Sequence, residues 1–312
     1  MNSPSNGVSS APLRSLARAR YARLMPELEQ RGFLRLPIDP ELRLATGRIF
    51  ALADEFFARP AADKQRFSRP AWVEGYRELG PEYSQVPERP DLTESFSAWN
   101  RNRARPELAL WAAGCPLHGA LREASDLLDG MMRALFTAMA DHFAAARGGP
   151  ELAFRNGTYI QLNHYEPARH ARALLQDPHE DGHLVTLVQT NAPGLEIEID
   201  GRFVPAQTAE DELLLMPGSL LSLMTGYRVK PLYHQVRNSR RAERRSSLLY
   251  FVNPEIEQVL APWVANERNR GIDIIACANA APKQFGMPTL VDSLAGQAQT
   301  RRFEPPLAGA AE

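Results

Sequence analysis

The chain has 312 residues, enough for one large domain or two small ones. Hydrophobic residues make up 44% of it and charged residues 23%, a balance that excludes a largely disordered or fibrous protein. With 36 basic and 37 acidic side chains, the formal net charge is −1. This balance carries no electrostatic signal for nucleic acid or for an anionic membrane. We therefore expect a soluble globular protein with neither as its partner.

The cysteines and the ends of the chain bear on the compartment. Cys115 and Cys277 lie far apart and in no metal-binding spacing, which predicts neither a disulfide framework nor a zinc knuckle. The first twenty residues lack the apolar core of a signal peptide, and no later run reaches eighteen apolar residues. A cytoplasmic location is therefore expected. No pattern indicates an oligomeric state.

The N-terminal half is predicted to be mainly helical. Residues 1–12 are rich in Ser, Pro and Asn and are expected to form a disordered tail. Apolar residues recur at helical spacing in three segments, residues 13–30, 41–57 and 116–147. A short alternating run at residues 32–36 predicts a strand, whereas residues 69–105 mix Pro, Gly and aromatic residues and are interpreted as irregular.

After Gly148-Gly149-Pro150 the pattern becomes rich in strands. The candidate strands are residues 158–165, 183–190, 195–199, 203–207, 213–215, 220–225, 234–237 and 246–253. Turn signals separate them, and Asp200-Gly201 between alternating runs indicates a hairpin. Many short strands without intervening helices favour a double-sheet or barrel architecture such as a jelly roll. The pattern therefore predicts an α+β fold, with a helical front half packed on a β-sandwich.

The segment DPHEDGH carries His179 and Asp181 where the second candidate strand is expected to open. Side chains i and i+2 of an extended chain point to the same face, so the two can converge on one point. One imidazole and one carboxylate are two of the three protein ligands in the facial triad that binds Fe(II) and leaves positions open. The best candidate for the third ligand is His234, which begins an apolar strand further along the chain.

The HxD pair also has other interpretations. The pattern arises often by chance, and a lone His at a strand edge is usually a surface or hydrogen-bonded core residue. A His/Asp/His set would also suit a catalytic zinc ion. His183 shares the expected strand face with Asp181 and competes as a ligand, but two residues further along it should overshoot the site.

A second feature is the strand RSSLLYFVNP, which places Arg245 and Ser247 on one face of an otherwise hydrophobic run. A guanidinium fork beside a hydroxyl is a good receptor for a carboxylate, and a buried charge without a partner would be costly. The alternative is a solvated hairpin tip, which we prefer for Arg240, Arg241 and Arg244.

Together these residues resemble the isopenicillin N synthase-like iron(II)/2-oxoglutarate-dependent oxygenases. The combination consists of HxD, a distal His followed by Val, and RxS running into Asn-Pro. The resemblance extends to Gly32-Phe33, to the run FFARP with the following Lys64, to Gly75-Tyr76, and to the runs DLTESF and TYIQLNHYEP. It covers roughly residues 30 to 256.

The resemblance implies a double-stranded β-helix (jelly-roll) core with the helical N-terminal region packed against it. The helical region would span residues 13–150, the core 151–258, and a C-terminal segment packing on the core 259–312. Three residues would ligate Fe(II) and carry the catalysis: His179, Asp181 and His234. Three others would bind the carboxylate of the 2-oxoglutarate cosubstrate: Arg245, Ser247 and Tyr165. We prefer this register to the shifted pair Arg244 and Ser246, because the following residues then align without a gap.

The expected function is a dioxygenase that uses O2 to oxidise a small-molecule metabolite by hydroxylation, desaturation or cyclisation, releasing succinate and CO2. Two alternatives stay open: an oxidase of the isopenicillin N synthase type that needs no 2-oxoglutarate, and a jelly-roll binding protein with a vestigial site. Arg169, His170 and Arg172 precede the metal motif and would suit an anionic substrate, although a solvated loop is the simpler interpretation.

Overall fold

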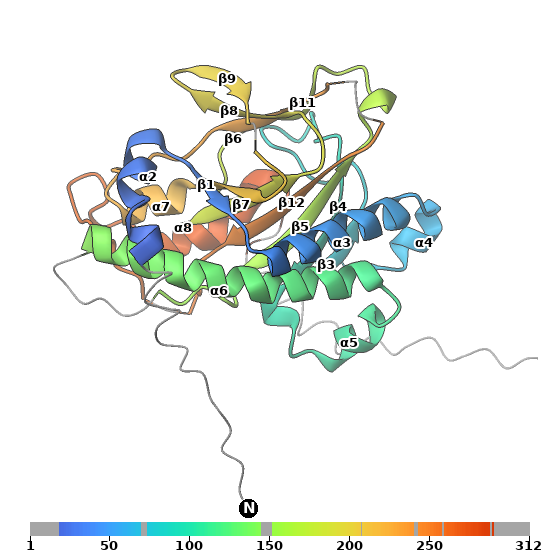
Figure 1. Cartoon of the computed structure of the whole chain (residues 1–312), viewed down its shortest axis with the longest axis horizontal. Helices are drawn as coiled ribbons and strands as arrows, with labels where there is room; N and C mark the ends of the chain where they lie inside the picture. The colour runs from blue at the N-terminus through green and yellow to red at the C-terminus, as the bar shows by residue number, and fades with distance from the viewer. Residues whose placement is uncertain are drawn as a thin grey trace, which may run out of the picture.

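The computed structural model describes residues 19–69, 74–144, 152–206, 208–239, 243–257, 259–287 and 289. A small antiparallel sheet lies over a large one, and helices cover the opposite face of the large sheet (Figure 1). The expected tail over residues 1–12 and the expected boundaries at 150/151 and 258/259 touch residues outside the described ranges. The division of the chain into those parts stays a prediction.

Helices are concentrated in the N-terminal half. The α-helices are α2 (Met25–Arg31), α3 (Pro40–Phe57), α4 (Ala61–Gln65), α5 (Pro106–Ala112), α6 (Pro116–Ala144), α7 (Ser219–Met224) and α8 (Ile274–Ala280). The short 3-10 helices are η2 (Asn100–Asn102), η3 (Pro167–Arg169) and η4 (Ala281–Phe285). Helix α3 begins where Asp39 accepts a 2.8 Å hydrogen bond from the backbone nitrogen of Leu42, with Pro40 at the first position. Its apolar face and that of α6 pack against the large sheet.

The strands form two antiparallel sheets within the described residues. The large sheet runs β1 (Leu34–Pro37), β10 (Glu212–Pro217), β7 (Val185–Thr190), β12 (Arg245–Val252), β5 (Tyr159–Tyr165), β4 (Glu94–Trp99), β3 (Glu74–Arg77) and β2 (Ser68–Arg69). The small sheet runs β6 (Leu174–His179), β11 (His234–Arg237), β8 (Leu195–Ile199) and β9 (Arg202–Pro205). Every residue of the central strand β12 is buried, because α3 and α6 cover one face of the sheet and the site lies on the other.

Three sequence expectations about elements were wrong. Residues 220–225, expected as a strand, lie largely in helix α7, because a short apolar run does not distinguish a strand from a buried helix. Residues 69–105, expected as irregular, contain β3 and β4. His179 was expected to open a strand but closes β6, and Asp181 follows in the turn before β7. The Asp-Pro pair in β6 is unusual in a strand, and for this reason the sequence pattern did not predict β6.

No helix among the described residues is both long and apolar enough to cross a membrane.

Candidate metal centre

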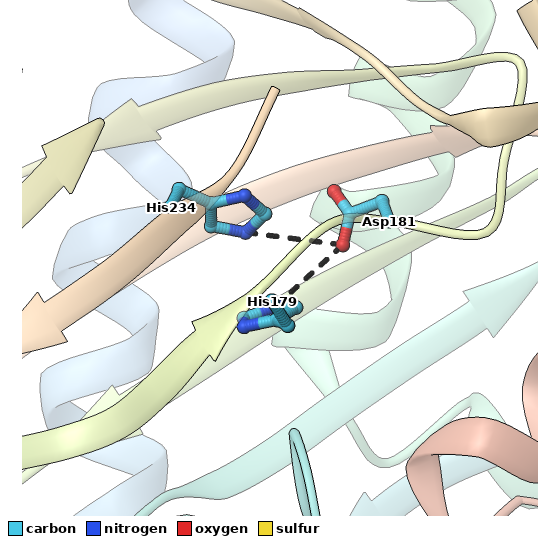
Figure 2. A group of neighbouring side chains, drawn as sticks. All are labelled: His179, Asp181 and His234. Carbon is cyan, nitrogen blue, oxygen red and sulfur yellow. Dashed lines mark ion pairs between the residues drawn. The ribbon is translucent and has the colours of Figure 1, made fainter. Parts of the chain in front are cut away.

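Two neighbouring strands of the small sheet bring two imidazoles into contact. His179 closes β6 and is the direct antiparallel partner of His234, the first residue of β11. Their ring centroids are 4.2 Å apart, and Asp181 turns back toward both from the loop after β6 (Figure 2). One ligand atom from each of the three residues lies within 4.8 Å of the others. The structure thus brings together the three residues proposed as ligands from the sequence.

Backbone carbonyls orient both imidazoles. The Nδ1 of His179 donates to the carbonyl oxygen of Asp177 at 2.8 Å, and the Nδ1 of His234 donates to that of Leu232 at 3.3 Å. Each Nε2 therefore faces the carboxylate, at 3.7 Å and 3.8 Å from Oδ1 of Asp181. An imidazole that donates from one nitrogen to a fixed acceptor presents the other as a metal ligand.

The carboxylate is held by its second oxygen and by the turn beneath it. Thr186 donates from Oγ1 to Oδ2 of Asp181 at 2.6 Å, which leaves Oδ1 for the imidazoles. Gly218 lies directly under this turn, where a Cβ atom would come within 2.3 Å of the Asp181 carbonyl oxygen and 2.2 Å of that of His183. Only glycine allows this close approach of the two backbones.

The electrostatics of the cluster suit a cation. All three side chains are buried. Burial, reinforced by the neighbouring His234, lowers the pKa of His179 to about 4. Burial opposes ionisation of Asp181, but its attraction to His234 and His179 outweighs this and lowers the pKa of the carboxyl group. At neutral pH, an unprotonated His179 and an ionised Asp181 are both in the state that binds a divalent metal.

His183 lines the same cavity, but its ring nitrogens are engaged by other residues. Its Nδ1 lies 2.9 Å from Oδ1 of Asn253, and its Nε2 lies 3.4 Å from the Tyr159 hydroxyl. It is buried against the ring of Phe251, and its ring atoms are not part of the His179–Asp181–His234 cluster. A hydrogen-bonded core histidine is the simplest description of this residue.

The carboxylate receptor expected from the sequence adjoins the cavity that the cluster lines: Ser247 and Tyr165 are among its lining residues, and Arg245 contacts both. Arg245 is only 1% exposed, and its Nη1 donates to Oγ of Ser247 at 2.8 Å. Its Nε and Nη2 are buried without a hydrogen-bond partner. Its guanidinium carbon lies 4.9 Å from the centre of the Tyr165 ring. A buried guanidinium with free donors beside a hydroxyl fits the carboxylate of a bound acid.

Tyr165 pairs directly with Arg245 across β5 and β12. Its hydroxyl donates to Oε1 of Gln176 at 3.1 Å and accepts from Nδ2 of Asn163 at 3.4 Å. Burial raises the pKa of Tyr165 to about 12, so the hydroxyl stays protonated at neutral pH. Tyr165 therefore offers a neutral, already oriented hydroxyl beside the guanidinium.

A single cavity joins these two groups. Its walls include the three cluster residues, Tyr165 and Ser247. Sequence reasoning missed other residues that line it, among them Glu82, Asp91, Gln161, Asn163, Phe285 and Met287. Asp91 lies in the run DLTESF, but that run carries no chemical signal of its own. Phe285 contacts the ring of His179 edge-on, at 5.8 Å between centroids, from a segment that matched no known pattern.

The basic loop before the metal motif is occupied elsewhere. Arg172 pairs with Asp177 at 3.3 Å, and Arg169 pairs with Glu166 at 2.6 Å. Neither they nor His170 are among the residues that line the cavity. This agrees with the solvated-loop interpretation of these residues.

Comparisons with known proteins agree with the geometry. Residues 157–254 match the 2OG-Fe(II) oxygenase superfamily. Gibberellin 20 oxidase 1-A of Triticum aestivum is 27% identical over 260 residues, which are 79% of this chain and 70% of that protein.

Solved structures share the fold. A 2OG-Fe(II) oxygenase family protein from Caulobacter crescentus superposes with a TM-score of 0.70 at 20% identity, covering 86% of this chain and 95% of that one. A full-length Neurospora crassa protein, solved in complex with alpha-KG, gives a TM-score of 0.62 at 18% identity, covering 86% and 91%. The expected α+β jelly-roll fold is thereby confirmed. The match over residues 157–254, together with the gibberellin 20 oxidase relatives, supports the expected Fe(II)/2-oxoglutarate-dependent oxygenase, an oxidoreductase.

Proposed function

We propose that this protein oxidises a small-molecule metabolite, with His179, Asp181 and His234 holding Fe(II) and with Arg245, Ser247 and Tyr165 holding the distal carboxylate of 2-oxoglutarate. The observation that carries the proposal is Arg245, a fully buried cation with two unsatisfied donors, whose neighbours Ser247 and Tyr165 line the same cavity as the histidine cluster. A buried guanidinium without a carboxylate partner is costly in the protein alone and becomes favourable once an acid binds.

Fe(II) bound with 2-oxoglutarate and O2 would supply the oxidising chemistry, with decarboxylation of the keto acid to succinate and CO2 and oxidation of a C–H bond of the substrate. The residues of this chain bind and orient. His179, Asp181 and His234 would hold the metal at the cavity wall, and a set of three protein ligands would leave coordination positions for the cosubstrate and O2. The buried walls limit access of water.

The class of substrate follows from the shape of the site. The cavity is lined by residues of both sheets and by Phe285 and Met287, and such a concave site suits a small molecule. The relatives carry names of enzymes that act on small metabolites, such as gibberellin 20 oxidase and a flavonoid 7-O-demethylase of Ocimum basilicum. We also propose a cytoplasmic location, in keeping with two cysteines that are both free.

The proposal is tested by adding 2-oxoglutarate to the iron-loaded protein without oxygen. Chelation of Fe(II) by the keto acid should produce a visible charge-transfer absorption, and admission of oxygen with a metabolite panel should then release succinate in step with substrate loss. Oxygen consumption with substrate but without 2-oxoglutarate would instead identify an oxidase of the isopenicillin N synthase type. A protein that binds neither iron nor the keto acid would have a vestigial site.

A further inference from the structure

Two carboxylates line the cavity besides the metal ligand Asp181. Glu82 and Asp91 lie in the loop that precedes β4, and both face the space into which Tyr165 and His179 project. The proposed function uses neither of them. Their surroundings differ, and this difference indicates what the substrate must carry.

The charge of Glu82 is matched inside the protein. Its Oε1 lies 2.5 Å from Nε of Arg77 and accepts a 2.9 Å hydrogen bond from Oγ of Ser95. Arg77 also donates to Gln161 at 2.7 Å, which fixes the guanidinium in place. Glu82 and Arg77 therefore form a neutral pair on the cavity wall.

Asp91 is matched only by neutral groups. It is 3% exposed, and its carboxylate accepts from Oγ of Ser84 at 2.8 Å and from Nε2 of Gln176 at 3.2 Å. Arg89, two residues before it in the chain, and Arg172, which donates to the carbonyl oxygen of the adjacent Pro90, both form ion pairs with Asp177 instead. Among the described residues, no ion pair involves the Asp91 carboxylate. A buried carboxylate in this condition lacks the cation that would offset its desolvation.

A count of the charges in the site with Fe(II) and 2-oxoglutarate bound also leaves Asp91 without a balancing cation. Arg245 would balance the distal carboxylate of 2-oxoglutarate. Fe(II) would be balanced by Asp181 together with the carboxylate of the keto-acid end. Glu82 is balanced by Arg77. One negative charge is left on the cavity wall, on Asp91, and the substrate is the one component that has not been counted.

We propose that the substrate carries a protonated amine that forms an ion pair with Asp91. The inference rests on the proposed function and specifies its substrate class. A cationic nitrogen supplies the charge-assisted hydrogen bonds that Ser84 and Gln176 do not. Because Gln176 links Asp91 to the Tyr165 hydroxyl, the amine would bind beside the acid-binding end of the cavity and direct the rest of the substrate toward His179.

If Asp91 only anchored the loop, a variant without its charge would behave differently from one in which Asp91 binds the substrate. Ser84 donates to both of its oxygens, so Asp91 also anchors the loop that carries Glu82. Asp91→Asn keeps the size of the side chain and an acceptor for Ser84 but removes the charge. A purely anchoring residue would therefore lose no selectivity among ligands in this variant.

The test compares amines with their alcohol counterparts. Butylamine and butanol, phenethylamine and phenylethanol, and tryptamine and tryptophol are titrated calorimetrically into protein loaded with Fe(II) and 2-oxoglutarate without oxygen. In the wild type, at least one amine should bind roughly tenfold or more tightly than its alcohol. Asp91→Asn should abolish this preference by weakening the amine roughly thirty-fold, the effect expected on truncating one partner of a buried ion pair.

Two controls separate the possible failures. Glu88→Gln removes an exposed carboxylate from the same loop and should change nothing. The affinity for 2-oxoglutarate should also be unchanged in Asp91→Asn. If no amine binds wild type more tightly than its alcohol, or if Asp91→Asn keeps the preference, the inference is wrong. The wild-type comparison decides even if the variant fails to fold. The comparison of amines with alcohols can also be repeated on metal-free protein. Failure of iron or 2-oxoglutarate to bind would refute the proposed function, and it is measured separately from the preference for amines.

Discussion

Two buried polar regions of this protein differ in how completely their hydrogen bonds are satisfied. Glu74, on β3, accepts from Nη2 of Arg122 at 2.7 Å, from Nδ2 of Asn102 at 2.7 Å and from the backbone nitrogen of Trp99 at 3.0 Å, and it lies 2.8 Å from Nε2 of His118. Arg245, equally buried on β12, has one partner and two donors left over.

The difference separates structure from function. The Glu74 network joins β3 and β4 to α6 and needs nothing from outside, so it supports the fold. The Arg245 region keeps two buried donors without partners, which is costly in the protein alone, and in the proposed function a bound carboxylate would satisfy them. Glu74 and Arg245 are equally buried, so burial does not distinguish them, whereas the number of their hydrogen-bond partners does. Substitutions should therefore affect activity in one region and stability in the other.

The largest effect is expected at the metal cluster. His179→Ala or His234→Ala removes one of three protein ligands and should abolish both iron binding and succinate formation. His183→Ala should retain iron, because its nitrogens face Asn253 and Tyr159. Iron content after anaerobic reconstitution measures both expectations. Loss of iron in His183→Ala, with retention in His179→Ala, would show that the ligand set is wrong.

The next largest effect concerns the acid-binding end. Arg245→Lys and Ser247→Ala should raise the dissociation constant for 2-oxoglutarate roughly thirty-fold or more, since losing one partner of a desolvated charge pair costs about 2–5 kcal/mol. Iron affinity should stay unchanged. Anaerobic titration of the charge-transfer band measures both quantities. Arg244 is exposed and serves as the control; a loss in Arg244→Ala without one in Arg245→Lys would mean that the functional strand face is shifted by one residue.

Glu74→Gln tests the satisfied region. It should lower the free energy of unfolding by about 3 kcal/mol, because the charge of Arg122 would be left buried without its partner. Chemical denaturation measures this loss, and the affinity of the folded fraction for 2-oxoglutarate should not change. A variant as stable as the wild type would contradict the structural role.

The same variant has a defined pH dependence. Burial opposes ionisation of Glu74, but the hydrogen bond with His118 and the charge of Arg122 outweigh it and lower the pKa of the carboxyl group. A lowered folded-state pKa stabilises the protein above the ordinary carboxyl pKa of about 4.3, and this contribution is lost as the pH falls through the folded value. The stability difference between the wild type and Glu74→Gln should therefore be full at neutral pH and shrink below about pH 4.

The smallest effect has the opposite sign. Arg245→Met replaces an incompletely paired buried cation with an apolar side chain of similar length. It should raise the free energy of unfolding of the ligand-free protein by about 1 kcal/mol while removing the affinity for 2-oxoglutarate. Denaturation curves with and without 2-oxoglutarate measure both parts. A destabilised variant would place Arg245 among the structural residues together with Glu74.

Local patterns predicted the elements that depend on local signals. Strands β8 and β11 have the predicted bounds, and α3 and α6 begin within a residue of the predicted positions. The HxD pair and the RxS pair are close in sequence, and each was found as a pair. Their mutual placement could not be worked out from spacing, because it depends on the pairing of β6 with β11 and of β5 with β12. It came from the family resemblance.

Other features depend on contacts that leave no local pattern. Strand β6 contains Asp177 and Pro178 and is held by its pairing with β11 rather than by its own propensity. The carboxylates of Glu82 and Asp91 face the cavity because β3, β4 and β5 pair across long stretches of chain. Arg77 and Glu82, five residues apart, would be indistinguishable from a surface pair without the sheet around them.

The residues that line the cavity come from three separate parts of the chain. The metal cluster, Tyr165 and Ser247 all fall within residues 157–254, the segment that matches the superfamily. Glu82 and Asp91 come before it, and Phe285 and Met287 come after it. If the proposed function is correct, the reactive centre and the surfaces that select a substrate lie in different segments of the chain and can be inherited separately. Recombination that exchanges the flanking segments would change which molecules enter while leaving the oxidising machinery intact.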